Sequence, residues 1–123
     1  MTPGNLSLTI YQGSTFRRKL KLEIAPTPPE TVGTQVDLTG ATVRMQVRLN
    51  AASDDILLEL NDSNGRLVIT DEQNGELTMY ISATDTAALD FTQGVYDMEI
   101  EYANGVVDRI LYGNVKLSKE VTR

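Results

Sequence analysis

Apolar and polar residues alternate along much of this chain with a period of two, the pattern that predicts β-strands with one buried face. The clearest example ends the stretch Ser82–Tyr102, where Tyr96, Met98 and Ile100 share one face and acidic side chains line the other. A strand with one apolar and one charged face is typical of an antiparallel sheet that covers a core on one side. This stretch therefore predicts a two-layer β structure.

The same alternation predicts seven further strands. They cover residues 6–10, 15–24, 41–49, 56–60, 67–70, 77–82 and 107–118. Gly113 lies where the apolar positions of the last strand change phase, which predicts a β-bulge at this glycine. Three Asn-Gly pairs separate neighbouring strands and predict type I′ hairpin turns, in which both residues have a positive φ. The pairs are Asn64-Gly65, Asn74-Gly75 and Asn104-Gly105.

Two segments interrupt the strand pattern. Residues 82–90 favour a short helical turn, near 83–90, because Ser82 or Thr84 can cap it and Asp85 suits its first turn. Residues 25–38 predict a long exposed loop without regular structure, because prolines are dense there. These prolines are Pro26, Pro28 and Pro29.

Seven to eight strands with frequent turns predict an all-β fold, an antiparallel β-sandwich, with a small closed barrel as the alternative. A chain of 123 residues is long enough for one core, so we expect a single domain over 1–123.

Composition narrows the function classes. A hydrophobic content of 41% and a charged content of 23% are typical of a globular domain, and no apolar run approaches a membrane span. The start of the chain lacks a signal-peptide pattern. The sequence has no Cys and no His, which removes thiol chemistry and the commonest proton shuttle and metal ligand. The net charge of −6 argues against nucleic-acid binding.

The segment around Tyr96 resembles the corner that precedes the penultimate strand of immunoglobulin-like sandwiches. Gly94, Tyr96 and Met98 stand at the positions of the small residue, the tyrosine and the cysteine of that pattern, whereas Thr92 replaces its acidic residue. The resemblance implies an immunoglobulin-like sandwich without a disulfide, in which the Tyr96 hydroxyl bonds to the backbone and ties the crossover to the strand. The alternative is that Tyr96 is an ordinary core residue.

A second resemblance extends over most of the chain. The blocks that carry it are LTIYQGSTFRRKLKL, VDLTGATVRMQVR, GELTMYISATDTAALDFTQGVYDMEIEY and GVVDRILYGNVKLSKEVTR. In this order they are similar to small tailed-phage and prophage proteins encoded among tail and baseplate genes, and less closely to the N-terminal domain of upper baseplate proteins. The resemblance implies an immunoglobulin-like virion module without catalytic residues, made in the bacterial cytoplasm, whose partners are other virion proteins and further copies of itself.

Candidate chemistry is sparse. Asp54, Asp55, Asp62 and Asn64 lack the spacing of an EF-hand, and Asx turns explain them equally well. Glu99 and Glu101 lie on an outward face, where we expect them to pair with Arg44 and Arg48 of a neighbouring strand. We therefore expect neither an enzyme nor a cofactor or metal site.

The basic run of the second strand is the other charged feature. Arg17, Lys19 and Lys21 share one face, with Arg18 on the other. This face is either an ordinary solvated surface or, with the proline-rich loop, a surface for a partner.

Three functions therefore stay open. The first is a virion structural protein that docks onto tail, baseplate or tail-fibre subunits. The second is a receptor- or carbohydrate-binding module at a fibre tip, for which Tyr11, Tyr80 and Tyr112 are the candidate aromatics. The third is a head, collar or neck accessory protein.

Overall fold

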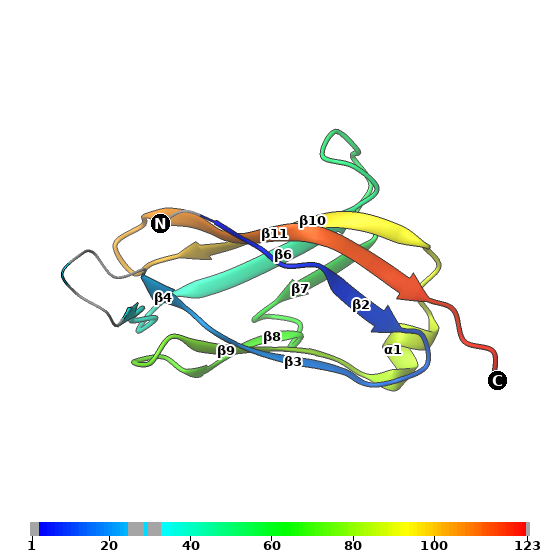
Figure 1. The fold of residues 1–123 in the computed structure, drawn as a ribbon, viewed down its shortest axis with the longest axis horizontal. Helices are drawn as coiled ribbons and strands as arrows, with labels where there is room; N and C mark the ends of the chain where they lie inside the picture. Colours follow the sequence, from blue (N-terminus) through cyan, green and yellow to red (C-terminus); the bar gives the residue numbers. More distant parts are fainter. Residues whose placement is uncertain (1–2, 25–28, 30–32, 123) are drawn as a thin grey trace.

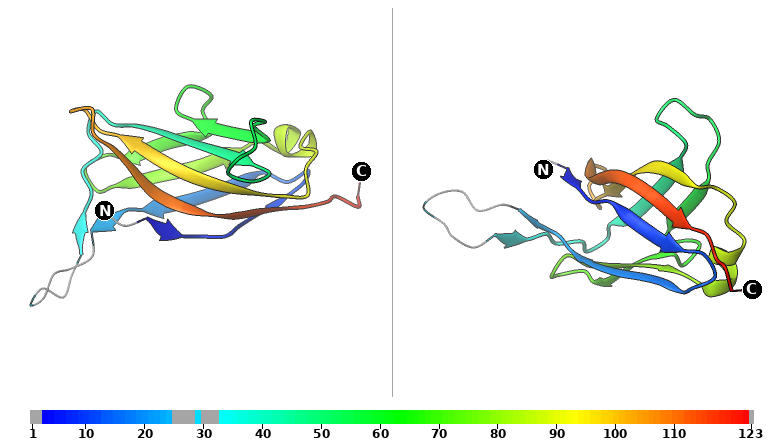
Figure 2. Two further views of the ribbon diagram at one scale, coloured as in Figure 1. Left: turned by 90° about the horizontal axis from the view of Figure 1, so that it is seen from above. Right: turned by 45° about the vertical axis from the view of Figure 1, so that its right-hand side comes forward.

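Two β-sheets pack face to face in the computed structural model, which describes residues 3–24, 29 and 33–122 (Figure 1). The large sheet contains β1 (Gly4–Asn5), β2 (Leu8–Tyr11), β11 (Val107–Ser118), β10 (Gln93–Glu101), β6 (Thr42–Arg48) and β7 (Leu58–Asn61). The small sheet contains β3 (Phe16–Lys21), β9 (Glu76–Ile81) and β8 (Leu67–Asp71). A ribbon of β4 (Glu23–Ile24) and β5 (Thr34–Gln35) extends from one end, and α1 (Ala83–Ala87) lies at the other (Figure 2).

The order of the strands is that of an immunoglobulin-like sandwich. The chain passes from β3 in the small sheet to the β6–β7 hairpin in the large one, returns through β8–β9, and finishes in β10–β11. One sheet then has the order β3-β9-β8 and the other β11-β10-β6-β7, as in domains of this class. The predicted all-β, immunoglobulin-like class is confirmed. The eight longer strands match the predicted number, and the other three contain two residues each.

One part of the prediction is wrong, because the sandwich is not wholly antiparallel. β1 and β2 run parallel to β11, with Gly4 opposite Leu111 and Leu8 opposite Val115. The same offset of positions holds along both pieces, so they form one edge strand with an interruption at Leu6 and Ser7. Sequence alternation predicts a strand and its buried face, but it carries no information about the direction of a distant partner.

The core follows from the alternation of the strands. Met98 and Ile100 of β10 are fully buried and lie opposite Met45 and Val43 of β6. From the small sheet, Met79 is fully buried as well. Each such side chain contributes about 1.5–3 kcal/mol on removal from water, so the facing rows of the two sheets stabilise the sandwich.

Two of the three Asn-Gly turns form hairpins, at Asn74-Gly75 and Asn104-Gly105. The predicted hairpin at Asn64-Gly65 is wrong, because this turn joins β7 of the large sheet to β8 of the small sheet. None of the three turns is of type I′. Gly65, Gly75 and Gly105 have positive φ, whereas no described residue other than glycine does. In the last of the three, Gly105 N–H donates to the carbonyl of Tyr102 and Tyr102 N–H to that of Val106. This is a type I turn followed by a left-handed glycine, which the same Asn-Gly signature also fits.

The expected loop over 25–38 is wrong at its C-terminal end, and residues 25–28 and 30–32 lie outside the described residues. Thr34 and Gln35 pair with Ile24 and Glu23, and beyond them Val36 and Leu38 are buried. A valine and a leucine two positions apart suffice to return the chain to the core, and this pattern outweighs the prolines that precede it.

Two further expectations differ in position. The last strand shifts register between Arg109 and Leu111, so the bulge lies at Ile110, whereas Gly113 pairs regularly with Tyr96. The helix is shorter than 82–90, and its cap is Ser82, whose Oγ accepts a hydrogen bond from Asp85 N–H at 3.2 Å.

Candidate functional site

The Tyr96 side chain forms a long-range hydrogen bond. Its hydroxyl donates to the carbonyl oxygen of Leu6 at 2.6 Å. The resemblance implied a bond to the backbone, and the structure has one, but the acceptor belongs to the N-terminal edge strand and not to the crossover before β10. Burial raises the pKa of Tyr96 to about 12, against a smaller opposing effect from the positive charge of Arg18. The hydroxyl therefore stays protonated and fixes the edge strand to β10.

Two glycines make this arrangement possible. A Cβ atom at Gly113 would collide with the carbonyl of Leu6 and stand 3.3 Å from the Tyr96 ring. At Gly94, a Cβ atom would lie 2.8 Å from the carbonyl oxygen of Arg48. Gly94 thus allows β10 to approach β6 closely, and Gly113 makes room for Leu6 over β11.

A second network joins three distant segments at the α1 end of the sandwich. Thr86 is completely buried, and its Oγ1 donates to the Ser14 carbonyl at 2.8 Å and accepts from Gly13 N–H at 3.0 Å. Gln12 Nε2 donates to the Leu89 carbonyl at 3.1 Å, and its Oε1 accepts from Glu120 N–H at 2.9 Å. These residues come from the YQGS, SATDTAAL and LSKE blocks of the sequence. Three segments that are far apart in the sequence therefore contribute to one structural junction.

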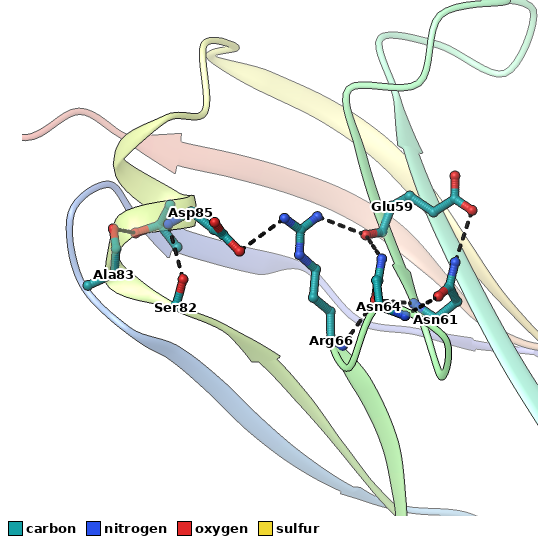
Figure 3. Close-up of polar contacts among 8 residues, drawn as sticks. Glu59, Asn61, Asn64, Arg66, Ser82, Ala83 and Asp85 are labelled. Carbon is teal, nitrogen blue, oxygen red and sulfur yellow. Dashed lines mark hydrogen bonds and ion pairs between the residues drawn. The ribbon is translucent and has the colours of Figure 1, made fainter.

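Arg66 connects the two sheets with α1 (Figure 3). Its guanidinium donates to the Glu59 carbonyl at 3.1 Å and to the Asp85 carboxylate at 3.1 Å. Asn64 Oδ1 accepts the backbone N–H groups of Asn61 and Arg66, so this calcium candidate serves as a turn-forming residue. In the described part of the chain, no three His, Cys, Asp or Glu side chains are grouped as a metal site requires.

Three basic residues of β3, Arg17, Lys19 and Lys21, lie on the outer face of the small sheet. Arg17 stacks over Tyr80, with 5.7 Å between its guanidinium carbon and the ring centre. Lys19 lies 3.8 Å from the Glu76 carboxylate and is largely exposed, as is Lys21. Pro29 is exposed, whereas Pro26 and Pro28 lie outside the described residues.

The outer face of the large sheet carries the expected row of acidic residues on β10, Asp97, Glu99 and Glu101. Of the two ion pairs that were predicted for this row, one is present. Arg44 Nε lies 3.3 Å from the Glu99 carboxylate, as predicted. The pairing of Arg48 with this row is wrong, because the register places Arg48 opposite Val95, at the far end of β10 from Glu101. The structure instead pairs Asp97 with Arg109 of β11, at 3.4 Å.

A groove of about 670 Å³ lies on this same outer face, and we call it the sheet groove. It is lined by Asn5, Gln46, Arg48, Asn50, Ala51, Val95, Tyr96, Asp97, Arg109, Tyr112, Gly113 and Asn114. The sequence prediction missed it, because its residues come from β1, β6, β10, β11 and the loop after β6. Outward-facing polar residues of four strands carry no shared signal in the sequence. Of the candidate aromatics, only Tyr112 lies here.

The buried polar side chains of the described residues are all hydrogen-bonded. Every described buried side-chain nitrogen or oxygen has a hydrogen-bond partner.

Besides Tyr96, burial also raises the pKa of Tyr102, with the nearby carboxylate of Asp108 acting in the same direction. The pKa of Asp37 is lowered by hydrogen bonds from the Thr39 hydroxyl and backbone. No described helix has the length and apolarity to cross a membrane.

Comparisons with known proteins give no close relative. No family model and no curated protein matches the chain. Among solved structures, it is similar to Drosophila OTK, extracellular domains 3–5, at 17% identity and a TM-score of 0.35 over 90% of this chain. The chain spans 32% of the length of that OTK chain. A second similarity, at 9% identity and a TM-score of 0.39, is to a structure from a photo-crosslinking analysis of multimeric cell-adhesive interactions of VGSC beta subunits. That match covers 96% of this chain and 93% of the other.

Proposed function

We propose that this chain is a structural protein of a tailed-phage virion, an immunoglobulin-like module that docks onto tail, baseplate or tail-fibre subunits and performs no catalysis. The observation that carries the proposal is the ordered series of sequence blocks that resembles the tail-associated family. Three of these blocks meet at the junction of Gln12 and Thr86, where their residues hold the fold together. The outer surfaces of the sandwich are then left for contacts with partners.

The test is the composition of purified particles. Particles from bacteria that carry the encoding genome are purified by density gradient, and the chain is quantified by mass spectrometry against a major capsid and a major tail protein. A structural role predicts a copy number in fixed ratio to the tail protein, and a multiple of three or six fits a ring. Separation of heads from tails then assigns the location. A chain that is abundant in the lysate and absent from the particles contradicts the proposal.

A further inference from the structure

The sheet groove has the composition of an interface. Of the residue types depleted at protein–protein contacts, the lining contains no Lys, Glu or Ser and only Ala51 and Asp97. It contains instead Tyr112, which is 44% exposed, and two arginines, and these are residue types enriched at binding hot spots. The outer face of the small sheet differs, since Lys19, Lys21 and Glu76 lie there. The two outer surfaces of the sandwich are therefore unequal.

Arg48 is held in place before any partner arrives. Its Nη1 donates to the Ser53 carbonyl at 2.9 Å, and its Nη2 donates to Gln46 Oε1 at 2.8 Å. A guanidinium has five N–H donors, so three are not used by these bonds. Because the side chain is already ordered, a ligand that binds it avoids most of the entropy cost of fixing an arginine.

The charge of Arg48 is not compensated. Among the described ion pairs, Asp97 is paired with Arg109 and none includes Arg48. The groove therefore has one excess positive charge on a chain whose net charge is −6. A carboxylate matches the fork of a guanidinium and is the complement of that charge.

We propose that the sheet groove binds a protruding acidic segment of a partner protein, with an Asp or Glu carboxylate of that segment on Arg48. An adjacent apolar or aromatic residue of the segment packs on Tyr112 and Val95. A protein segment fits better than a sugar because only one of the two aromatic rings in the lining, Tyr112, is exposed, whereas Tyr96 is buried. That the partner is another virion protein rests on the proposed function.

The experiment places a photoreactive amino acid at Ala51, an exposed position on the rim of the groove, in bacteria that assemble the particles. Mass spectrometry of the illuminated particles identifies the crosslinked residue. The expected adduct lies within a few positions of an Asp or Glu in a different protein. Arg48→Gln in the same background should reduce its yield at least about tenfold, the loss expected when one member of a close charge pair is removed.

Arg44→Gln is the matched control, because Arg44 lies on the same strand and the same outer face but outside the groove. It should leave the adduct within about twofold, since the pair that it removes is exposed. Thermal unfolding of both variants verifies that each is folded. Replacement of the partner's Asp or Glu by Arg, combined with Arg48→Glu in this chain, exchanges the two charges and should restore the adduct.

Three outcomes would overturn the inference: an adduct to a second copy of this chain, an adduct to a glycan, or no adduct while the chain is present in particles. The last outcome leaves the proposed function intact. If the chain is absent from the particles, the proposed function is wrong instead. The groove is then tested with the purified chain and the lysate proteins, by the same crosslink from Ala51 and its loss in Arg48→Gln.

Discussion

Tyr96 and Leu6 are 90 positions apart in the chain and are joined by a 2.6 Å hydrogen bond from the tyrosine hydroxyl to the leucine carbonyl. Gly113 lies directly beneath them, and its missing side chain leaves the space in which the bond forms. Through this contact, the edge strand β1–β2 is attached to β10 as well as to its neighbour β11.

Tyr96→Phe should destabilise the protein by about 1 kcal/mol or more, because the ring remains while the Leu6 carbonyl loses its donor. Chemical denaturation measures the change, and hydrogen exchange should show faster exchange in Leu8–Tyr11 than elsewhere. Tyr11→Phe is the control, since the Tyr11 side chain is 62% exposed and should change stability little. Equal stability of the two variants would mean that the bond contributes nothing.

Stability should also fall steeply at alkaline pH. The folded state raises the pKa of Tyr96 from 10 to about 12, so the stability that the protonated hydroxyl contributes is fully present below pH 10 and is lost as the pH rises towards 12. Between pH 10 and 12 the unfolded chain releases this proton while the folded chain keeps it, which costs about 1.4 kcal/mol per pH unit. Denaturation of wild type and Tyr96→Phe across this range should show a shallower decline for the variant. Tyr102, whose pKa is also raised, produces the residual slope in both. Parallel curves would contradict this account.

Gly113→Ala should displace the N-terminal strand. The added methyl group meets the backbone of Leu6 and the Tyr96 ring, and overpacking of this kind costs about 1–3 kcal/mol. Gly105→Ala is a useful comparison because a methyl group there has no atom within 4 Å and reports only the strain of a positive φ. Combination with Tyr96→Phe should cost less than the sum of the two changes, because both act on Leu6. A Gly113→Ala protein as stable as wild type would show that the strand accommodates the methyl group.

Thr86→Val should cost about 1–3 kcal/mol, because it keeps the shape of a buried residue but leaves Gly13 N–H and the Ser14 carbonyl without a partner. Thr86→Ser keeps the hydroxyl and serves as the control for its role. Thermal unfolding should place Thr86→Ser above Thr86→Val. The opposite order would mean that the methyl group of Thr86, and not its hydroxyl, holds the junction.

Local pattern predicted much of this fold. Alternation located β6 and β10 and their buried rows, and the cap of α1 was visible at Ser82. Partner identity was predicted less well, because it depends on register. Arg44 and Arg48 look equivalent in the sequence, yet the register brings only Arg44 to an acidic residue. The Tyr96 hydroxyl was expected to bond to the backbone, but its acceptor depends on a parallel pairing more than 100 positions apart.

The sheet groove could not be predicted from the sequence. Gln46 and Val95 each lie between two buried neighbours, as outward-facing residues on any strand do, and the resulting pattern is the same with or without a groove. Only the register of β6, β10 and β11 places such residues next to Tyr112 and Arg48.

The parallel edge strand also has a mechanical consequence. Because β2 runs in the same direction as β11, the chain enters the pair at one end of the sandwich and leaves it at the other (Figure 1). Tension applied at Gly4 and Ser118 therefore pulls the two strands lengthwise past each other. All of their ladder hydrogen bonds then share the force at once, whereas strands peeled apart from one end would break them one by one. A chain built in this way resists stretching along its long axis.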